Sequence, residues 1–391
     1  MERLLIGLPD YRISRVISVT PTILEVCLDK QVCCPHCGSY SLRTKDSFWR
    51  YLRNVAVQGQ SSLLQIRCHK YRCNSCGCYF NTRLPGVKRW GRSTELLKRD
   101  VYRCYNNGYS NKDIAYENGI SVASVERYYH QVINTKNSHL KSYTWPRVLG
   151  IDEHRFTRKQ GFLTTFCNLE RHKVFDVAQG RSLPDLAPFI CQIEGREHVK
   201  VVCIDMNSSY RHLIRKWFPK AKIVSDRFHV IRLVNHHFMK VCKLIDEATL
   251  AYGRFGLMRL MQKKRERLTE KQQNKLERYF EGQPAIAAIY SFCHDLNDLL
   301  RVKSQTRRSC RKYVKQLLDA IAQLKASNFA PMKTLGRTLY SWREEIACMF
   351  RFTRNNGITE GFHRKMKLIQ RRAYGFRNFE NYRLRVKVLC C

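Results

Sequence analysis

Two aspartates end apolar runs of the kind that form buried strands. Asp152 ends the run VLGID at 148–152, and Asp205 ends the run VKVVCID at 199–205. Continuous apolar runs indicate strands that are buried on both faces, and open α/β sheets place their sites at the carboxyl ends of such strands. Burial of an isolated carboxylate is costly unless it is paired or binds a metal. Two aspartates on neighbouring strand ends therefore predict a site for Mg²⁺ or Mn²⁺.

A third acidic ligand is expected in the C-terminal region. Residues 355–385 contain two acids, Glu360 and Glu380. Helical periodicity places four polar side chains on one face, namely Glu360, His363, Arg364 and Lys367. A single glutamate among so many cations is either a salt-bridge partner or a metal ligand. The residues alone leave both interpretations of Glu360 open.

Other acids compete for the same roles. Glu153 follows Asp152, but neighbours on a strand point to opposite faces, so both cannot enter one site. Asp226 ends a further apolar run, and we interpret it, together with His229, as a helix cap or as support behind the metal ligands. A direct catalytic role of Asp226 is the alternative. Asp176 is expected to be a solvated residue of a hairpin.

The elements around these acids alternate between strands and helices. We expect a strand at 148–152, a hairpin over 161–179 that turns at Arg171-His172, and further strands at 199–205 and 222–226. Helices are predicted at 182–193 and 209–218. Such alternation is typical of an α/β layer. The long, charged stretch from about 231 to 350 has a helical pattern and a net charge of +12 by count. We interpret it as a helical insertion that contacts DNA or a second subunit, or that covers the core as a solvated layer.

Two cysteine pairs near the N-terminus predict a zinc ribbon. Cys34 and Cys37 in CPHCG, and Cys73 and Cys76 in CNSCG, form two C-x-x-C knuckles, each followed by a glycine that suits a tight turn. Four thiolates favour a closed tetrahedral, structural Zn²⁺ site. Alternating sequence between the knuckles indicates strands. Unligated buried thiols are the alternative, and three nearby cysteines are competing ligands: Cys33, Cys68 and Cys78.

The segment 93–133 has the layout of a helix-turn-helix. Ser93, Ser110 and Ser121 are predicted helix caps, with Asp113 completing a capping box. Val122, Val125 and Tyr129 are the expected apolar positions of the last helix. Its outer face would present Ala123, Ser124, Glu126, Arg127 and His130 to the major groove of DNA. An ordinary helical hairpin without a DNA role is the alternative.

The composition points to a polyanionic partner. Among the 391 residues, 71 Lys and Arg face 32 Asp and Glu, for a formal charge of +39, while 44% hydrophobic residues provide a core. Nucleic acid is the expected partner, and an anionic membrane is the competitor. With no run of about 18 apolar residues and no signal-peptide pattern, we expect a soluble, cytoplasmic, nucleoid-associated protein. The C-terminal cations Arg364, Lys365, Lys367, Arg371 and Arg372 are expected to grip phosphates. The interleaved Tyr374, Phe376 and Phe379 either stack on bases or pack in the core.

Nearly the whole chain resembles the insertion-sequence transposases of the ISL3 family. The motifs that carry the resemblance are CPHCG, CNSCG, GIDEHRF, IDMNSSYR, SDRFHV, ITEGFHRKMK and, most distinctively, RRAYGFRNFENYRLR at 371–385. The resemblance implies an RNase H-like α/β core with a helical insertion, preceded by a zinc ribbon and a helix-turn-helix. It implies an Asp-Asp-Glu triad on Asp152, Asp205 and Glu360. Similar proteins commonly have Asn where this chain has His363, and His363 is expected to support the metal ligands or to contact DNA.

The expected domains are a zinc ribbon at 1–90, a helix-turn-helix at 91–145 and a catalytic domain at 146–391. The expected function is binding of the terminal inverted repeats of an insertion sequence, cleavage at the element ends and joining of the 3′-hydroxyl to target DNA by two-metal chemistry. A homo-oligomer on double-stranded DNA is implied by the resemblance. Two alternatives remain: a non-catalytic DNA-binding regulator derived from a transposase, and another RNase H-like nuclease such as a junction resolvase.

Overall fold

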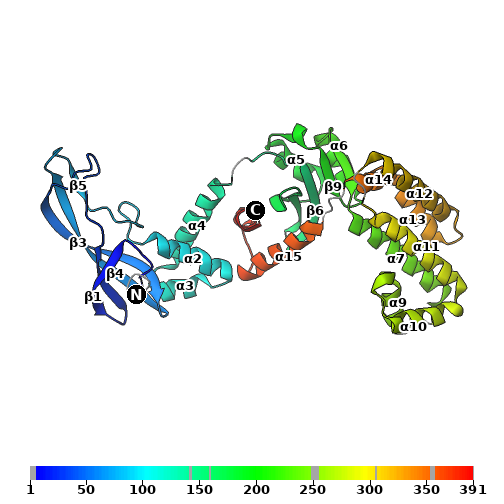
Figure 1. Ribbon diagram of the computed structural model, residues 1–391, viewed down its shortest axis with the longest axis horizontal. Helices are drawn as coiled ribbons and strands as arrows, with labels where there is room; N and C mark the ends of the chain where they lie inside the picture. The colour runs from blue at the N-terminus through cyan, green and yellow to red at the C-terminus, as the bar shows by residue number, and fades with distance from the viewer. Residues whose placement is uncertain are drawn as a thin grey trace. The chain divides into compact units, whose positions relative to one another are not determined.

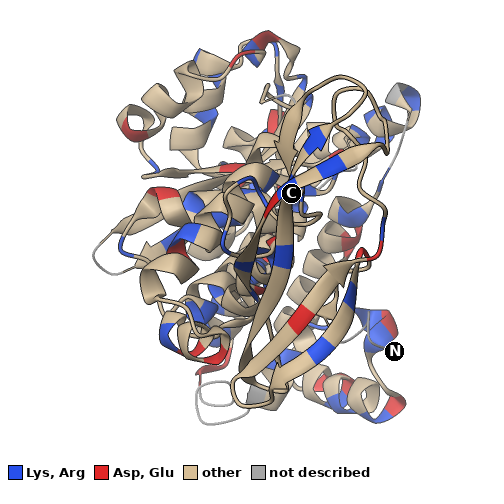
Figure 2. Cartoon of the chain, turned by 90° about the vertical axis from the view of Figure 1, so that its left-hand side faces the viewer, with Lys and Arg blue, Asp and Glu red and all other residues tan. Residues whose placement is uncertain are grey.

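The computed structural model describes residues 6–140, 143–157, 160–247, 255–303, 306–352 and 357–390. The chain divides into two compact units. The first unit comprises Met1–Lys141 together with Met366–Val388, and the second comprises Ser142–Lys365 together with Leu389–Cys391. None of the described helices is both long and apolar enough to cross a membrane. Figure 2 marks the positions of Lys and Arg on strands and helices alike, with fewer positions of Asp and Glu.

The first unit begins with a five-stranded sheet (Figure 1). Its strands are β1 (Tyr11–Ser18), β2 (Thr22–Leu28), β3 (Leu42–Val57), β4 (Gln60–Cys73) and β5 (Tyr79–Asn81), in the order β1-β2-β4-β3 with β5 paired to β4. The predicted alternation between the cysteine pairs is confirmed in β4, where Leu64, Ile66 and Cys68 point into the core. The register Leu42↔Cys73 fixes where β4 ends in the second knuckle.

Three helices follow the sheet: α2 (Glu95–Asn107), α3 (Asn111–Asn118) and α4 (Val122–Ser138). The predicted capping box of Ser110 with Asp113 is present, and Ser121 accepts a hydrogen bond from the Ser124 amide. The prediction that Ser93 caps α2 is wrong. Thr94 caps the helix, and Ser93 is buried against the Tyr128 hydroxyl at 2.5 Å. Val122 was expected on the apolar face of α4, but it is exposed. Of the three expected apolar positions, only Val125 and Tyr129 face the other two helices.

Residues 366–388 pack with the helices of the first unit. They include the end of α15 (Gly357–Arg372) and most of α16 (Phe379–Cys390). Arg372 donates to the Asn106 carbonyl at 3.3 Å, and the Tyr374 hydroxyl donates to the Gly108 carbonyl at 3.1 Å. Gly108 ends α2 at φ 98, a conformation that favours glycine.

The cation at Arg385 holds this C-terminal segment in place. Arg385 is 6% exposed, and its guanidinium lies over three rings, at 4.3 Å from the ring centroid of Tyr105, 4.7 Å from Tyr129 and 4.9 Å from Phe376. Cation–π contacts gain strength when the cation is removed from water. The aromatic side chain of Phe376 therefore packs within the first unit.

Arg385→Ala is expected to destabilise the protein by about 2–4 kcal/mol, because it removes three cation–π contacts and leaves a cavity. Chemical denaturation of the full chain measures this loss. Arg371→Ala, which removes an exposed cation from α15, is the matched control and should change stability little. Equal stability of the two variants would contradict the structural role of Arg385.

The second unit contains a mixed five-stranded sheet with helices around it (Figure 1). Its strands are β6 (Val148–Thr157), β7 (Gly161–Asn168), β8 (Lys173–Gln179), β9 (Val201–Ile204) and β10 (Lys222–Ser225), in the order β10-β9-β6-β7-β8. The predicted β7–β8 hairpin is confirmed, as are α5 (Leu183–Cys191) and α6 (Ser208–Trp217).

Two details of this sheet differ from the predictions. Asp152 does not end its strand, because β6 continues to Thr157 in antiparallel pairing with β7. Asp176 is not solvated. It is fully buried and accepts a hydrogen bond from the Tyr143 hydroxyl. In both cases the aspartate pairs with β7, where Asp152 lies opposite Thr165 and Asp176 lies opposite Phe166.

The described part of the insertion is helical, as predicted. It contains α7 (Arg227–Ile245), α9 (Phe255–Met261), α10 (Glu270–Glu281), α11 (Pro284–Arg301), α12 (Arg307–Ala326), α13 (Ala330–Ser341) and α14 (Arg343–Arg351). These helices share one hydrophobic core with the sheet. The buried Arg227 donates to the carbonyls of Leu300, Val302 and Met349, which attaches the start of α7 to α11 and α14. The insertion therefore contributes to the second unit's core, while its outward faces are exposed.

Candidate active site and metal centres

Three aspartates lie in a row across the sheet of the second unit. In the parallel pairing of β6 with β9, Gly150 lies opposite Cys203, so continuing the register by two residues brings Asp152 beside Asp205. In the pairing of β9 with β10, Ile204 lies opposite Ser225, so Asp226 falls beside Asp205 on its other side. Neighbouring strands are about 4.8 Å apart. The sheet thus gathers three carboxylates that are distant in sequence.

The first of these, Asp152, meets α15 through a histidine. The Nδ1 atom of His363 lies 3.7 Å from the Asp152 carboxylate, and its Nε2 atom lies 3.2 Å from the Thr165 hydroxyl. Thr165 is the cross-strand partner of Asp152, and it also contacts the His154 ring nitrogen at 3.2 Å. His154 and Asp152 are two residues apart on a strand and therefore share a face. His363 thus attaches the helix that carries Glu360 to the strand that carries Asp152.

The other two aspartates form a compact cluster with a histidine. Asp205, Asp226 and His229 present ligand atoms that all lie within 4.8 Å of one another. His229 Nδ1 is 3.2 Å from Asp205, and its Nε2 is 3.8 Å from Asp226. Asp226 is also the N-cap of α7, where it accepts from the Phe228 amide. The interpretation of Asp226 and His229 as support behind Asp205 agrees with these contacts, but direct ligation by Asp226 fits them too.

The electrostatics of this row favour a bound cation. Burial, opposed by the Glu153 amide and assisted by nearby carboxylates, raises the pKa of Asp152 to about 7. Burial together with the charges of Asp152 and Asp226 raises the pKa of Asp205 to about 8. The Oδ1 atom of Asp205 is buried and accepts no hydrogen bond. A hard divalent cation such as Mg²⁺ would supply the missing partner and relieve the repulsion, so the donors present fit such an ion.

Without a divalent cation, the stability of the second unit is expected to fall as the pH rises from about 4 to about 8. The folded pKa values of Asp152 and Asp205 lie above the ordinary value of 3.8, so the folded state binds more protons than the unfolded state in this window. Rising pH therefore favours unfolding. Asp205→Asn removes one of these groups, and it should melt at a higher temperature than the wild type at pH 8 in EDTA. An equal decrease in melting temperature from pH 5 to pH 8 for both proteins would contradict this origin.

Glu360 reaches the same region but stands apart from the compact cluster. It lies in the first turn of α15, its side chain is 58% exposed, and it pairs with Arg364 at 3.2 Å. Its charge contributes to the raised pKa of Asp152 after burial and the nearer carboxylates. Within the described part of the chain, Glu360 does not join the cluster of Asp205, Asp226 and His229. Both of the interpretations drawn from its sequence, ion pair and ligand, are therefore compatible with its position.

Glu153 takes a different environment from Asp152, as expected for adjacent strand residues. Its carboxylate lies 3.6 Å from Arg181 and 3.5 Å from the Tyr210 hydroxyl. It nevertheless lines a pocket of about 460 Å³ together with Asp205 and Arg232. Sequence reasoning missed Tyr210 and Arg232 as members of this site. Arg232 follows His229 by three residues, and this helical spacing was the signal in the sequence that could have identified Arg232.

The four cysteines of the first unit converge as predicted. Cys34 Sγ lies 3.6 Å from Cys76 Sγ, and Cys37 Sγ lies 3.5 Å from Cys73 Sγ. Each knuckle closes with an amide of its glycine, Gly38 or Gly77, donating to the first cysteine carbonyl. Both glycines have positive φ, at 74 and 73. The local turns thus aim four thiols at one point, which is the arrangement of a closed tetrahedral zinc site.

The thiols differ in how readily they ionise. Hydrogen bonding from the Cys76 amide lowers the pKa of Cys73 to about 6, and the Cys37 amide lowers the pKa of Cys34. The hydrogen bonds from the Ser39 and Cys78 amides are outweighed by burial and by hydrogen bonds with the other thiols, which raise the pKa values of Cys37 and Cys76, to about 12 for Cys76. Zinc binds thiolates, so the donor set fits this ion. Among the described residues, Cys68 does not join the four clustered cysteines, and its side chain points into the sheet core instead. Cys78 remains a possible competitor, since it groups with His36 and Cys76.

The residues predicted to contact DNA are accessible. On α4, Arg127 and His130 are exposed and Ser124 is half-buried, with Arg127 donating to the Ser124 hydroxyl at 3.1 Å. On α15, Arg364, Lys367, Arg371 and Arg372 are exposed. Arg364 is partly neutralised by Glu360, and Arg372 also has the structural contact to Asn106.

Two comparisons relate this chain to known proteins. A family model described as "Transposase", for the DDE transposases of the ISL3 group, matches residues 149–386. The chain is also similar to the "Transposase for insertion sequence element IS1001" of Bordetella parapertussis. The two are 21% identical over 383 residues, which cover 92% of this chain and 88% of that protein.

Proposed function

Because the chain belongs to the ISL3 family of DDE transposases, we propose that it cleaves DNA at the ends of an insertion sequence and joins the ends to a target. Asp152, Asp205 and Glu360 form the acidic triad in this proposal, within an RNase H-like core. The single observation that carries it is the row of carboxylates on β6 and β9, with raised pKa values and an unsatisfied oxygen on Asp205.

Each residue of the site has a separate task. Asp152 and Asp205 would hold Mg²⁺ or Mn²⁺ from the sheet, and Glu360 would complete the ligand set after exchanging its ion pair with Arg364. When bound, two such cations lower the pKa of an attacking water or 3′-hydroxyl and stabilise the leaving oxygen in an in-line displacement. His363 positions α15 against Asp152, and His229 orients Asp205.

The cationic and zinc-binding parts of the chain would provide DNA recognition. A zinc ion on Cys34, Cys37, Cys73 and Cys76 would hold the two knuckles together. The helices α2–α4 would act as a helix-turn-helix, with Ser124, Arg127 and His130 of α4 facing the terminal repeats. Lys367, Arg371 and Arg372 would contact phosphates. Joining two element ends in one reaction requires a homo-oligomer on double-stranded DNA in the nucleoid.

The test uses a duplex that carries the DNA flanking the protein's own gene, incubated with the purified chain and Mg²⁺. We expect cleavage that leaves a 3′-hydroxyl, and loss of that cleavage in Glu360→Gln. Glu380→Gln is the matched control, because it makes the same change at a glutamate of α16 that pairs with Arg383 and lies outside the acidic row. Binding of the ends without cleavage by the wild type would favour the regulator. Preferential cutting of branched DNA would favour a resolvase.

A further inference from the structure

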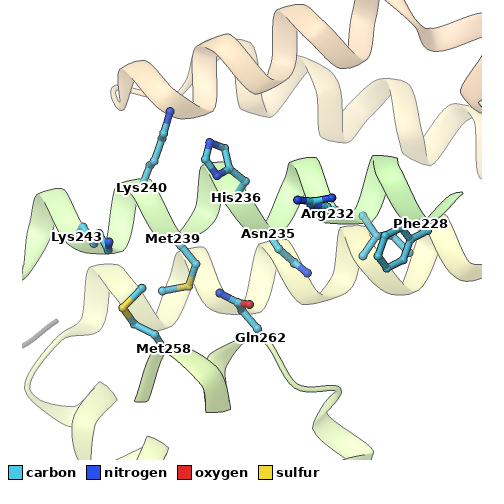
Figure 3. Close-up of a pocket in the computed structure, with 10 residues that line it drawn as sticks. Phe228, Arg232, Asn235, His236, Met239, Lys240, Lys243, Met258 and Gln262 are labelled. Atoms are coloured by element: carbon cyan, nitrogen blue, oxygen red, sulfur yellow. The ribbon is translucent and has the colours of Figure 1, made fainter. Parts of the chain in front are cut away.

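A second groove lies along α7, beside the acidic pocket. It has a volume of about 540 Å³ and is lined by α7 and by residues at the end of α9. Figure 3 shows His236 and Lys240 along one edge, and Met239, Met258 and Gln262 along the other. The groove is therefore two-sided, with a cationic edge and an edge of apolar and amide groups.

The ionisable side chains that line the groove are all basic. Arg232, His236, Lys240 and Lys243 line it and are exposed, and none of the described residues that line it is acidic. From Arg232 to Lys243 the helix rises about 16 Å at 1.5 Å per residue. That length is enough to contact several phosphates of one DNA strand. The cationic edge thus matches a polyanion that extends along α7.

The groove is continuous with the acidic pocket. Arg232 and His236 line both cavities, and the second cavity contains Asp205 and His229. Burial raises the pKa of Asp205 and the positive charge of Arg232 opposes that rise, so Arg232 lies within electrostatic reach of the carboxylates. A chain of phosphates leaving the acidic site would meet Arg232 first and then the remaining cations of α7.

The apolar groups indicate which form of DNA fits. Phe228 is 53% exposed at the end of the groove nearest Asp226, and Met239 is 6% exposed on its floor. In a duplex the base faces are stacked on one another and are unavailable to such side chains. An unpaired strand exposes them, and proteins that bind single strands combine a cationic track with an aromatic stacking platform.

We propose that the α7 groove holds an unpaired DNA strand next to the cleavage site, with its phosphates on Arg232, His236, Lys240 and Lys243 and a base on Phe228. This assignment rests on the proposed function, because it takes the strand to run from the carboxylates. It adds that the DNA beside the cut is melted over a few nucleotides and that the insertion stabilises the melted form.

The test compares two DNA probes in EDTA, where binding occurs without cleavage. One probe is a blunt duplex with the flanking sequence of the gene, and the other carries the same duplex with a single-stranded tail of several thymidines. The wild type is expected to bind the tailed probe about tenfold more tightly, the gain of stacking about one base. In Lys240→Ala/Lys243→Ala the salt slope for the tailed probe should fall by about 1.4, since each single-strand contact contributes about 0.7.

Two further variants and a crosslinking experiment test whether the preference for the tailed probe comes from the groove. Lys312→Ala/Lys315→Ala removes two exposed lysines from α12, outside the groove, and should keep the preference and the slope. Phe228→Ala should lose most of the preference for the tailed probe while its affinity for the blunt probe stays unchanged. Photocrosslinking from 5-iodouracil in the tail should label peptides within 228–262 of the unmodified protein.

Three outcomes would overturn the groove assignment. They are equal affinity of the wild type for both probes, an unchanged salt slope in the Lys240/Lys243 variant, and crosslinks that map outside 228–262. Metal-dependent cleavage of the blunt duplex by the wild type tests the proposed function separately. The groove assignment can therefore fail while the transposase proposal stands.

Discussion

Asp205→Asn is expected to lower the rate of metal-dependent DNA cleavage by more than about 100-fold. Removing a residue that only hydrogen-bonds to a metal ligand typically costs about 10- to 100-fold, so the expected loss is larger. Asn is nearly isosteric with Asp but carries no charge, so the fold is kept while the attraction for a cation is lost. Asp205 is the member of the row with an unsatisfied buried oxygen and with carboxylates expected on both sides. Its substitution should therefore act on chemistry and leave DNA binding in EDTA unchanged.

Asp226→Asn is the matched control for this prediction. Asn also caps helices, so it can accept the hydrogen bond from the Phe228 amide that Asp226 accepts. Because Asp226 acts through His229, its replacement should lower the cleavage rate by about tenfold. A loss as large as that of Asp205→Asn would instead make Asp226 a direct metal ligand. Full cleavage activity in Asp205→Asn would refute the assignment of the site.

Removal of zinc is the second large effect. With a strong chelator, or in Cys73→Ser, we expect the knuckles to separate and the first unit to lose binding of the element ends. Zinc bound to four cysteines of a small fold contributes on the order of 10 kcal/mol to its folding. Cys73 lies at the end of β4, in register with Leu42 of β3, so unfolding of the knuckle would also fray the longest hairpin of the sheet.

Two cysteine variants test whether Cys33 and Cys78 bind the zinc ion. Cys33→Ser removes an exposed thiol beside the first knuckle and should retain one equivalent of zinc per chain. Cys78→Ser should retain it too, although Cys78 groups with His36 and Cys76. Mass spectrometry measures the zinc content of each variant, and circular dichroism measures whether the variant is folded. Loss of zinc from Cys78→Ser with retention by Cys34→Ser would place the ion on the competing set.

The sequence by itself determined the features that depend on neighbouring residues. A C-x-x-C knuckle with Gly38 or Gly77 forms through its own backbone hydrogen bonds, so its ligands were predictable from spacing. The caps at Ser110 and Ser121 and the β7–β8 hairpin are local for the same reason. Of the three serines predicted as helix caps, only Ser93 is wrong, because it is buried against Tyr128 and the adjacent Thr94 caps α2 instead.

The tertiary structure decided which distant residues meet. Asp152 and Asp205 were predicted as neighbours, but the parallel register of β6, β9 and β10 also placed Asp226 in the row. The burial of Asp176 depends on a contact with Tyr143, which lies far from it in the sequence. The cage around Arg385 likewise joins a C-terminal helix to α2 and α4. These positions depend on strand register and on packing between segments, which no periodicity within one segment encodes.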